Sequence, residues 1–593
     1  MIKLATKSRL QRIGRLVLSC LIALTLGACA RKAVVVAPPL KDELGPYNTV
    51  YLANSMPLCS SLAPESCSDP NIYPAVKYQI TAQAISAIQS WPAWSAPRAP
   101  IKTILISVLE QALGINSERS ITKSELDALF SPVVEKQSGI TLGEALSEDE
   151  RALINLHLAP SVFRDRQVML AKSANADSRT VYKDFVETAA KLTRNSENEP
   201  LIAVISSGSV HPMAAGDYYS QVLKQAGAKV VWLPIDPVFN RLSSSNQCQD
   251  FPQAYARYYG IEENFPEHYE AMAEKQMFYC RQRAILLSLL HSANAIYFTG
   301  EQSQPLLSSL YDAKGEENAY YRLIRRRLLS GTLVLGGANP ALLTLAYTGR
   351  EMRAAALIED YSGMNFFHDK GKEREALKCA DQEHCLKILG SRRASTNNTR
   401  QVKERGLIFS RHLDLNVSMA SMLRNMINEE RDFGIAMMRN SAVLLSHPNF
   451  GRITLKNLTQ SPVLVIDNLE ADLDISRRRV EIENGLLHLL RQNDSFTYSY
   501  VSKNMFVTLS GIADEQNNSA TESNMDLPDI NKKNAMMKWI NRFATSTLSD
   551  VEYQDTRVDL SLSKTSAFNL LFQTEGKRPK YSNLEYNVRF DKK

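Results

Sequence analysis

The chain has 593 residues, of which 44% are hydrophobic, and this length is enough for two to four domains with cores of their own. The formal net charge of +6 overstates its basic character, because residues 1–15 carry five basic side chains and no acidic one. The rest of the chain is therefore close to +1, which argues against a nucleic-acid partner and against a polybasic membrane patch.

The first residues have the pattern of a bacterial lipoprotein signal. After the basic segment, residues 16–28 (LVLSCLIALTLGA) form an uncharged apolar run that is too short to span a bilayer stably. The run leads into Leu26-Gly27-Ala28-Cys29, which resembles the lipobox of bacterial lipoproteins. We predict that residues 1–28 are removed and that the Cys29 thiol carries the lipid. An ordinary signal peptide with an incidental cysteine is the alternative.

A lipid on Cys29 predicts anchoring in the bacterial cell envelope. Each buried methylene contributes about 0.8 kcal/mol, so several acyl chains anchor a protein firmly. Ala30, rather than an aspartate, follows the cysteine and favours the outer membrane. No later segment reaches about 18 uncharged apolar residues, so we expect the remainder to be soluble, in the periplasm or at the cell surface.

The six cysteines after Cys29 are consistent with disulfide formation in an oxidising compartment. Because their pairing does not follow from number alone, their proximity in sequence is the only guide, and it suggests three local disulfides. These candidate pairs are Cys59–Cys67, Cys248–Cys280 and Cys379–Cys385. Cys379, His384 and Cys385 lack a second ligand pair at zinc spacing, so we predict no metal and no cofactor.

Changes in composition divide the mature chain into four regions. Residues 29–72 are rich in proline, serine and small residues and are predicted to form a tether with a small disulfide loop. Residues 73–198 have helical periodicity, with possible capping boxes at Thr122-x-x-Glu125 and Ser147-x-x-Glu150, and are predicted to form a helical domain.

Residues 199–502 alternate short apolar runs with amphipathic segments, which predicts a doubly wound α/β domain with a parallel sheet. In such sheets the functional loops follow the carboxyl ends of the strands, here residues 206–211, 299–304 and 336–341. Residues 503–593 are predicted to be a β-rich C-terminal extension with a flexible loop.

Five segments of residues 199–502, taken in order, resemble the cyanophycinase family of serine peptidases. They are LIAVISSGSVHPMAAGDYYSQVLKQAGAKVVWLPI, ANAIYFTGEQSQPLLSSL, LLSGTLVLGGANPALL, GLIFSRHLDLN and DFGIAMMRNSAVLL. The first resembles the opening strand and helix with paired aromatics, and the third stands at the family's nucleophile turn, "G-T-S-A-G-A". The resemblance implies a flavodoxin-like fold similar to that of class I glutamine amidotransferases.

The resemblance fails at the catalytic positions. The nucleophile serine falls on Ala338, or on Asn339 after a shift of one residue, and neither side chain can attack a carbonyl. The base falls on His412, which is retained, but the acid falls on Arg439, a cation that would not support an imidazolium. Replacement nucleophiles such as Ser330 or Ser441 are poorly placed relative to the turn. We therefore expect the family's hydrolysis to be absent.

The same loops offer a possible pocket. Its candidate residues are Ser209, His211, Glu301, Gln302 and Asn339. For His211, which could help to bind an anion at the start of the next helix, a plain turn is the alternative, and for Glu301 and Gln302 the alternative is a solvated loop. The leading hypothesis is a non-catalytic binding or structural module for a peptide-like or anionic ligand, or for envelope protein partners. The alternative is an active serine-type hydrolase acting on aspartyl-linked peptides.

Overall fold

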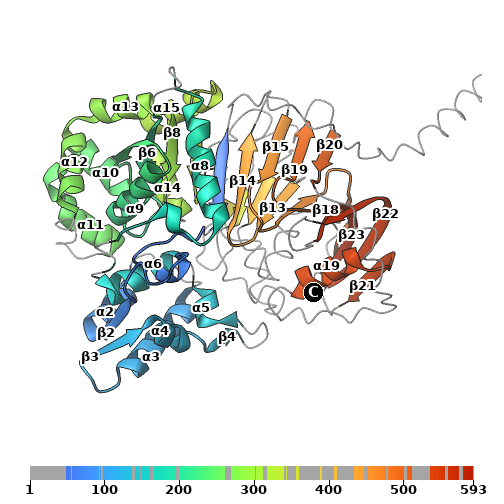
Figure 1. Cartoon of the computed structure of the whole chain (residues 1–593), viewed down its shortest axis with the longest axis horizontal. Coiled ribbons are helices and arrows are strands. Elements are labelled where there is room, and N and C mark those ends of the chain that lie inside the picture. Colours follow the sequence, from blue (N-terminus) through green and yellow to red (C-terminus); the bar gives the residue numbers. More distant parts are fainter. Residues whose placement is uncertain are drawn as a thin grey trace, which may run out of the picture.

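The structure is a computed structural model, and it describes residues 49–591 apart from a set of excluded segments. These are 55, 92–93, 95–97, 136–139, 147, 161, 163–165, 194–198, 261–268, 301, 312–316, 339–341, 343–355, 359–387, 390–406, 411–425, 427–432, 447–451, 476–478, 500–503, 511–534, 555–557 and 573–578. Figure 1 shows three regions: a small helical lobe, an α/β lobe above it, and a β-rich lobe beside the α/β lobe. No helix in the described residues is both long enough and apolar enough to cross a bilayer.

The α/β lobe is built on the parallel half of a nine-stranded sheet. The strands of this half are β7 (Lys229–Leu233), β6 (Leu201–Ile205), β8 (Ala295–Phe298), β9 (Val334–Gly337) and β1 (Val50–Asn54), in that spatial order. Each neighbouring pair is parallel. β6, β8 and β9 are buried almost throughout, which explains why their sequences are continuous apolar runs rather than alternating ones.

Helices connect and cover these parallel strands. α9 (Pro212–Gln225) links β6 to β7, α13 (Arg283–Ser292) precedes β8, and α15 (Ala319–Leu329) precedes β9. The other helices of this lobe are α8 (Ala176–Ala190), α10 (Pro237–Ser245), α11 (Phe251–Tyr259), α12 (Glu270–Arg281) and α14 (Ser303–Leu310). The predicted alternation of strands and helices is thus confirmed.

One face of the parallel half packs against α8 and α9. The ring of Phe185 on α8 lies 5.7 Å from that of Tyr297 on β8, and Tyr219 on α9 lies 5.1 Å from the same ring. Gly336 leaves room for Phe185, because a Cβ at that position would lie 2.5 Å from the phenyl ring. α8 was expected to belong to the helical domain, but its apolar face is part of the core of the sheet.

The sheet differs from the sequence expectation in two respects. First, β1 comes from the segment predicted to be a tether, and it lies in the middle of the sheet, between β9 and β14 (Ser441–Ser446). Second, the sheet is mixed and not wholly parallel. β14, β15 (Arg452–Asn457), β19 (Ser495–Ser499) and β20 (Asn504–Thr508) are antiparallel to their neighbours. The connections β14–β15 and β19–β20 are only a few residues long, too short for the crossover that parallel pairing requires.

A second sheet forms the β-rich lobe, as expected for the C-terminal region. Its main path runs β11 (Ile388–Leu389), β10 (Ala356–Ile358), β12 (Leu407–Ser410), β13 (Phe433–Met437), β16 (Val463–Asp467), β18 (Arg479–Leu490), β23 (Pro579–Asp591), β22 (Val558–Phe572) and β21 (Asp550–Gln554). β17 (Asp472–Ile475) pairs with β18, and α19 (Ala535–Thr545) packs on β22 and β23.

The chain passes repeatedly between the two sheets. It leaves the second sheet after β13, returns at β16, leaves again after β18 and returns at β21. The α/β domain is predicted to end at residue 502, but β19 and β20, on either side of that residue, pair with each other. In addition, β23 from the C-terminal segment pairs with β18. The C-terminal segment is therefore interleaved with residues 433–499 and is not a separate appendage.

The helical lobe has its own core. It contains α2 (Ala82–Gln89), α3 (Ala99–Leu113), α4 (Lys123–Leu129), α5 (Leu142–Ala145) and α6 (Glu148–Leu158), together with the pairs β2–β3 (Lys77–Thr81, Glu118–Thr122) and β4–β5 (Val133–Glu135, Ile140–Thr141). The predicted capping box of Thr122 and Glu125 is present at the start of α4. Ser147 lies outside the described residues.

Two of the three predicted disulfides are confirmed. Cys59 and Cys67 are bonded, with a Cα–Cα distance of 4.3 Å, and Cys248 and Cys280 are bonded, with a Cα–Cα distance of 5.9 Å. Cys379 and Cys385 lie outside the described residues, as does the predicted lipidation site, Cys29, and the predicted loop within 511–534.

Candidate functional site

A cavity of about 510 Å³ lies at the carboxyl edge of the parallel strands, where the α/β lobe meets the helical lobe. The three loops selected from the sequence all reach it: Ser209–His211 after β6, Gly300 after β8 and Ala338 after β9. Its volume is in the range of sites for small molecules, and its position is that of ligand sites in open α/β sheets. The cavity is therefore the candidate site.

The first two loops are held against each other by close backbone contact. Gly300 has φ +79°, and a Cβ there would lie 2.1 Å from the carbonyl carbon and oxygen of Gly208, so only glycine fits without displacement. The Gln302 N–H donates to the Gly208 carbonyl at 3.0 Å, and the hydroxyls of Ser209 and Thr299 are 2.7 Å apart. These contacts build one wall of the cavity.

His211 lines this wall and also caps α9. Its Nδ1 accepts the backbone N–H of Ala214 at 3.1 Å, and the side chain is buried. Burial lowers the pKa of His211 to about 3, so the imidazole is neutral at physiological pH and carries its proton on Nε2. The helix-capping role of His211 was not predicted from the sequence, which offered anion binding or a plain turn.

The expected catalytic positions do not all converge. Ala338 lines the cavity with a methyl group, at the end of β9, and is 9% exposed. Arg439 lies in the turn between β13 and β14 and is not among the lining residues. His412 lies outside the described residues, so its relation to Ala338 stays a prediction.

Some of the other residues predicted for the pocket line the cavity, and others do not. Ser209 and His211 line the cavity, whereas Gln302 precedes α14 and does not. Glu301 and Asn339 lie outside the described residues. Of the alternative serines, Ser330 donates to Arg327 O in an exposed turn and Ser441 donates to Met438 O, and neither lines the cavity.

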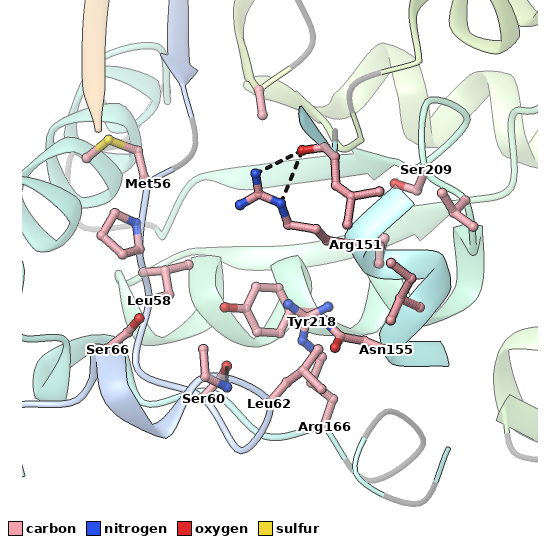
Figure 2. Close-up of a pocket in the computed structure, with 18 of the residues that line it drawn as sticks. Met56, Leu58, Ser60, Leu62, Ser66, Arg151, Asn155, Arg166, Ser209 and Tyr218 are labelled. Atoms are coloured by element: carbon pink, nitrogen blue, oxygen red, sulfur yellow. Dashed lines mark hydrogen bonds between the residues drawn. The ribbon is translucent and has the colours of Figure 1, made fainter. Parts of the chain in front are cut away.

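The opposite wall comes from residues that the sequence did not single out. α6 supplies Arg151 and Asn155, and the segment after it supplies Arg166. Arg151 donates from Nε and Nη2 to the Leu146 carbonyl at 3.2 and 2.8 Å (Figure 2). The sequence offered only an amphipathic helix here, and no local signal shows that one end of it faces a cavity.

Tyr218 on α9 lies within the lining and holds Arg166. The Arg166 guanidinium carbon is 3.7 Å from the centroid of the Tyr218 ring, a cation–π geometry visible in Figure 2. Burial raises the pKa of Tyr218, and the charge of Arg166 and hydrogen bonds with Ser60 and Arg166 partly offset that rise. Tyr218 and Tyr219 are the paired aromatics noted in the sequence, and both line the cavity.

The Cys59–Cys67 loop completes the lining. Ser60, Leu62 and Ser66 of this loop face the cavity. The loop is tied to residues 167–174, because Ser61 N–H donates to Gln167 O at 3.0 Å and Ala174 N–H donates to Ser66 O at 2.8 Å. The predicted small disulfide loop is thus a fixed wall of the site.

The arrangement can bind a small molecule between a neutral wall and a cationic one. The described residues contain no cluster of three histidine, cysteine or acidic side chains suited to a metal ion. No protein-family model and no curated protein sequence matches this chain, so the resemblance to cyanophycinases depends on the motifs alone.

Proposed function

We propose that this chain is a lipid-anchored protein of the bacterial envelope, whose cyanophycinase-like lobe binds a peptide-like or anionic ligand without hydrolysing it. The observation that carries the proposal is the cavity at the carboxyl edge of the sheet, with the methyl group of Ala338 at the position where the resemblance places a nucleophile.

The order of the parallel strands supports a flavodoxin-like assignment. In chain order β6, β7, β8 and β9 occupy the second, first, third and fourth places, as in flavodoxin-like sheets, and β1 takes the fifth. A ligand at the carboxyl ends of such strands agrees with the general rule for open α/β sheets.

The chemistry of the lining supports binding without hydrolysis. Serine attack needs a base with a free lone pair, and the lone pair of His211 Nδ1 already accepts the Ala214 amide. The Ser209 hydroxyl is paired with Thr299. Neither group is arranged as a nucleophile and base.

Export and anchoring are supported by the N-terminal pattern and by the two disulfides, which are typical of proteins outside the cytosol. We propose attachment at the outer membrane through Cys29, where envelope proteins are available as partners. Incorporation of an alkyne-palmitate label tests this anchor. Cys29→Ala should abolish labelling and Cys20→Ala should not, whereas labelling that survives Cys29→Ala would overturn the assignment.

Activity is tested on the full chain in detergent micelles. A serine-reactive fluorophosphonate should not label it, and no dipeptide should be released from a β-linked aspartyl polymer. Ala338→Ser serves as a comparison for what a restored hydroxyl can do. Covalent labelling of the wild-type chain, together with release of dipeptide, would establish the alternative of a working hydrolase.

A further inference from the structure

The charges around the cavity are unevenly distributed. The loops after β6, β8 and β9, and the cavity face of α9, contribute only neutral side chains to the lining, among the residues described. Among the described residues, the charged lining residues all come from the N-terminal 166 positions: Glu65, Lys123, Asp127, Arg151 and Arg166. The helical lobe and the segments flanking it therefore set the electrostatics of a site that the sheet positions.

Of the five charged residues in the lining, the two that matter most for a ligand, Arg151 and Arg166, are both cationic. Lys123 and Asp127 pair with each other one helical turn apart, with side chains 44% and 58% exposed, so their charges largely cancel at the rim. Glu65 is exposed, and solvent screens its charge. Arg151 and Arg166 are only partly exposed, and at such positions a charge acts more strongly on a ligand.

Both guanidinium groups are held in defined orientations. The Leu146 carbonyl accepts two N–H groups of Arg151, and the guanidinium carbon of Arg166 lies over the Tyr218 ring. A planar guanidinium that is fixed beforehand loses little side-chain entropy on binding and matches a carboxylate with two parallel hydrogen bonds. Figure 2 shows both side chains within one lining, from different segments of the chain.

We infer that the ligand carries a carboxylate, that Arg151 and Arg166 recognise it, and that the helical lobe together with the segment after it is the specificity element of the site. This inference rests on the proposed binding function and adds to it the chemical class of the ligand. The neutral wall, with Tyr218, Tyr219 and Ala338, contacts the uncharged remainder of the molecule.

The test uses matched probes on the full chain in detergent micelles: a panel of dipeptides, each as the free C-terminal acid and as the C-terminal amide. Binding is measured by calorimetric titration at low and high salt. We expect the acids to bind at least about tenfold more tightly than their amides, and less tightly at high salt. Arg151→Gln and Arg166→Gln should each weaken the acids about tenfold or more and leave the amides unchanged.

Matched variants separate a binding role from a structural one. Arg151→Lys and Arg166→Lys keep the charge but lose the planar fork, and should give intermediate affinity for the acids. Arg325→Gln removes an arginine from α15, outside the cavity, and should have no effect. Circular dichroism and thermal unfolding confirm that each variant is folded.

Each outcome has a distinct meaning. Selective loss of acid binding in the glutamine variants supports the inference. If acids and amides bind equally and Ala338→Phe blocks both, the binding function stands and the carboxylate inference is wrong. If no member of the panel binds, both proposals fail.

Discussion

The ion pair of Arg98 and Glu150 joins the start of α3 to α6 inside the helical lobe, next to the cavity. Arg98 Nε donates to Glu150 Oε1 at 2.7 Å, Nη2 lies 2.5 Å from Oε2, and Nη2 also donates to Ala145 O at 2.7 Å. The two side chains are 10% and 4% exposed. Removing Arg98 would leave the Glu150 carboxylate buried without its two-pronged guanidinium partner, at a cost of about 3–5 kcal/mol.

We therefore predict that Arg98→Met strongly destabilises the helical lobe. Amide hydrogen exchange, followed by mass spectrometry on peptides from α3 and α6, measures the free energy of opening of this lobe in the intact chain. At about 1.4 kcal/mol per factor of ten, exchange there should be faster by about two to four orders of magnitude. Peptides from β6 and β18 should be unchanged, because those strands belong to other cores.

The double variant Arg98→Met/Glu150→Leu distinguishes two causes of instability: the lost attraction between Arg98 and Glu150, and the cost of burying the Glu150 charge without Arg98. With both charges removed, stability should return to within about 1 kcal/mol of wild type. Lys123→Met, which breaks an exposed pair, should cost less than about 1 kcal/mol. Exchange less than tenfold faster in Arg98→Met, or a double variant as unstable as the single one, would refute the reasoning.

Three further predictions concern the other lobes. Gly300→Ala should destabilise the α/β lobe by more than the roughly 1–2 kcal/mol expected from a positive φ alone, because the added Cβ would collide with backbone atoms. Gly227→Ala (φ +104°, nothing within 4 Å) should cost only the strain of the positive φ. Urea unfolding of both variants measures the two losses of stability, and equal losses would contradict the prediction. Desolvation lowers the pKa of His488 to about 3, so below about pH 6.5 the unfolded chain binds a proton that the folded chain does not. Stability should then fall with decreasing pH by about 1.4 kcal/mol per unit for this group, and His488→Asn should flatten the slope measured between pH 7 and 5; an unchanged slope would count against it. Replacing Cys248 and Cys280 by serine opens a loop with a separation of 32 residues and should destabilise the α/β lobe by about 4 kcal/mol, and a thermal midpoint within 1 °C of wild type would argue against that.

The features predicted correctly depend on local patterns. The continuous apolar run of β6 is typical of a strand buried on both faces, and Thr122 with Glu125 supplies both halves of a capping box within one turn. The bonded cysteine pairs are neighbours in sequence. The loops of the site followed from the strands, because parallel strands place their carboxyl ends at one edge.

The features missed depend on partners that are distant in the chain. The VYLAN segment of β1 pairs with β9 and β14, which are hundreds of residues away, and nothing in these five residues distinguishes a central strand from part of a tether. The arginines of the cavity are similar, because Arg166 and the Tyr218 ring that it contacts are 52 residues apart in the chain.

The amino-acid sequence by itself determined the strand–helix alternation, two disulfides and the loops that border the cavity, because each of these is encoded in residues close together in the chain. Only the tertiary structure decided that the sheet is mixed, that β1 completes its parallel half, and that the helical lobe and the segment after it face the cavity with Arg151 and Arg166. The physical reason is that strand pairing and charge placement depend on which surfaces are buried together, and burial is a property of the whole fold.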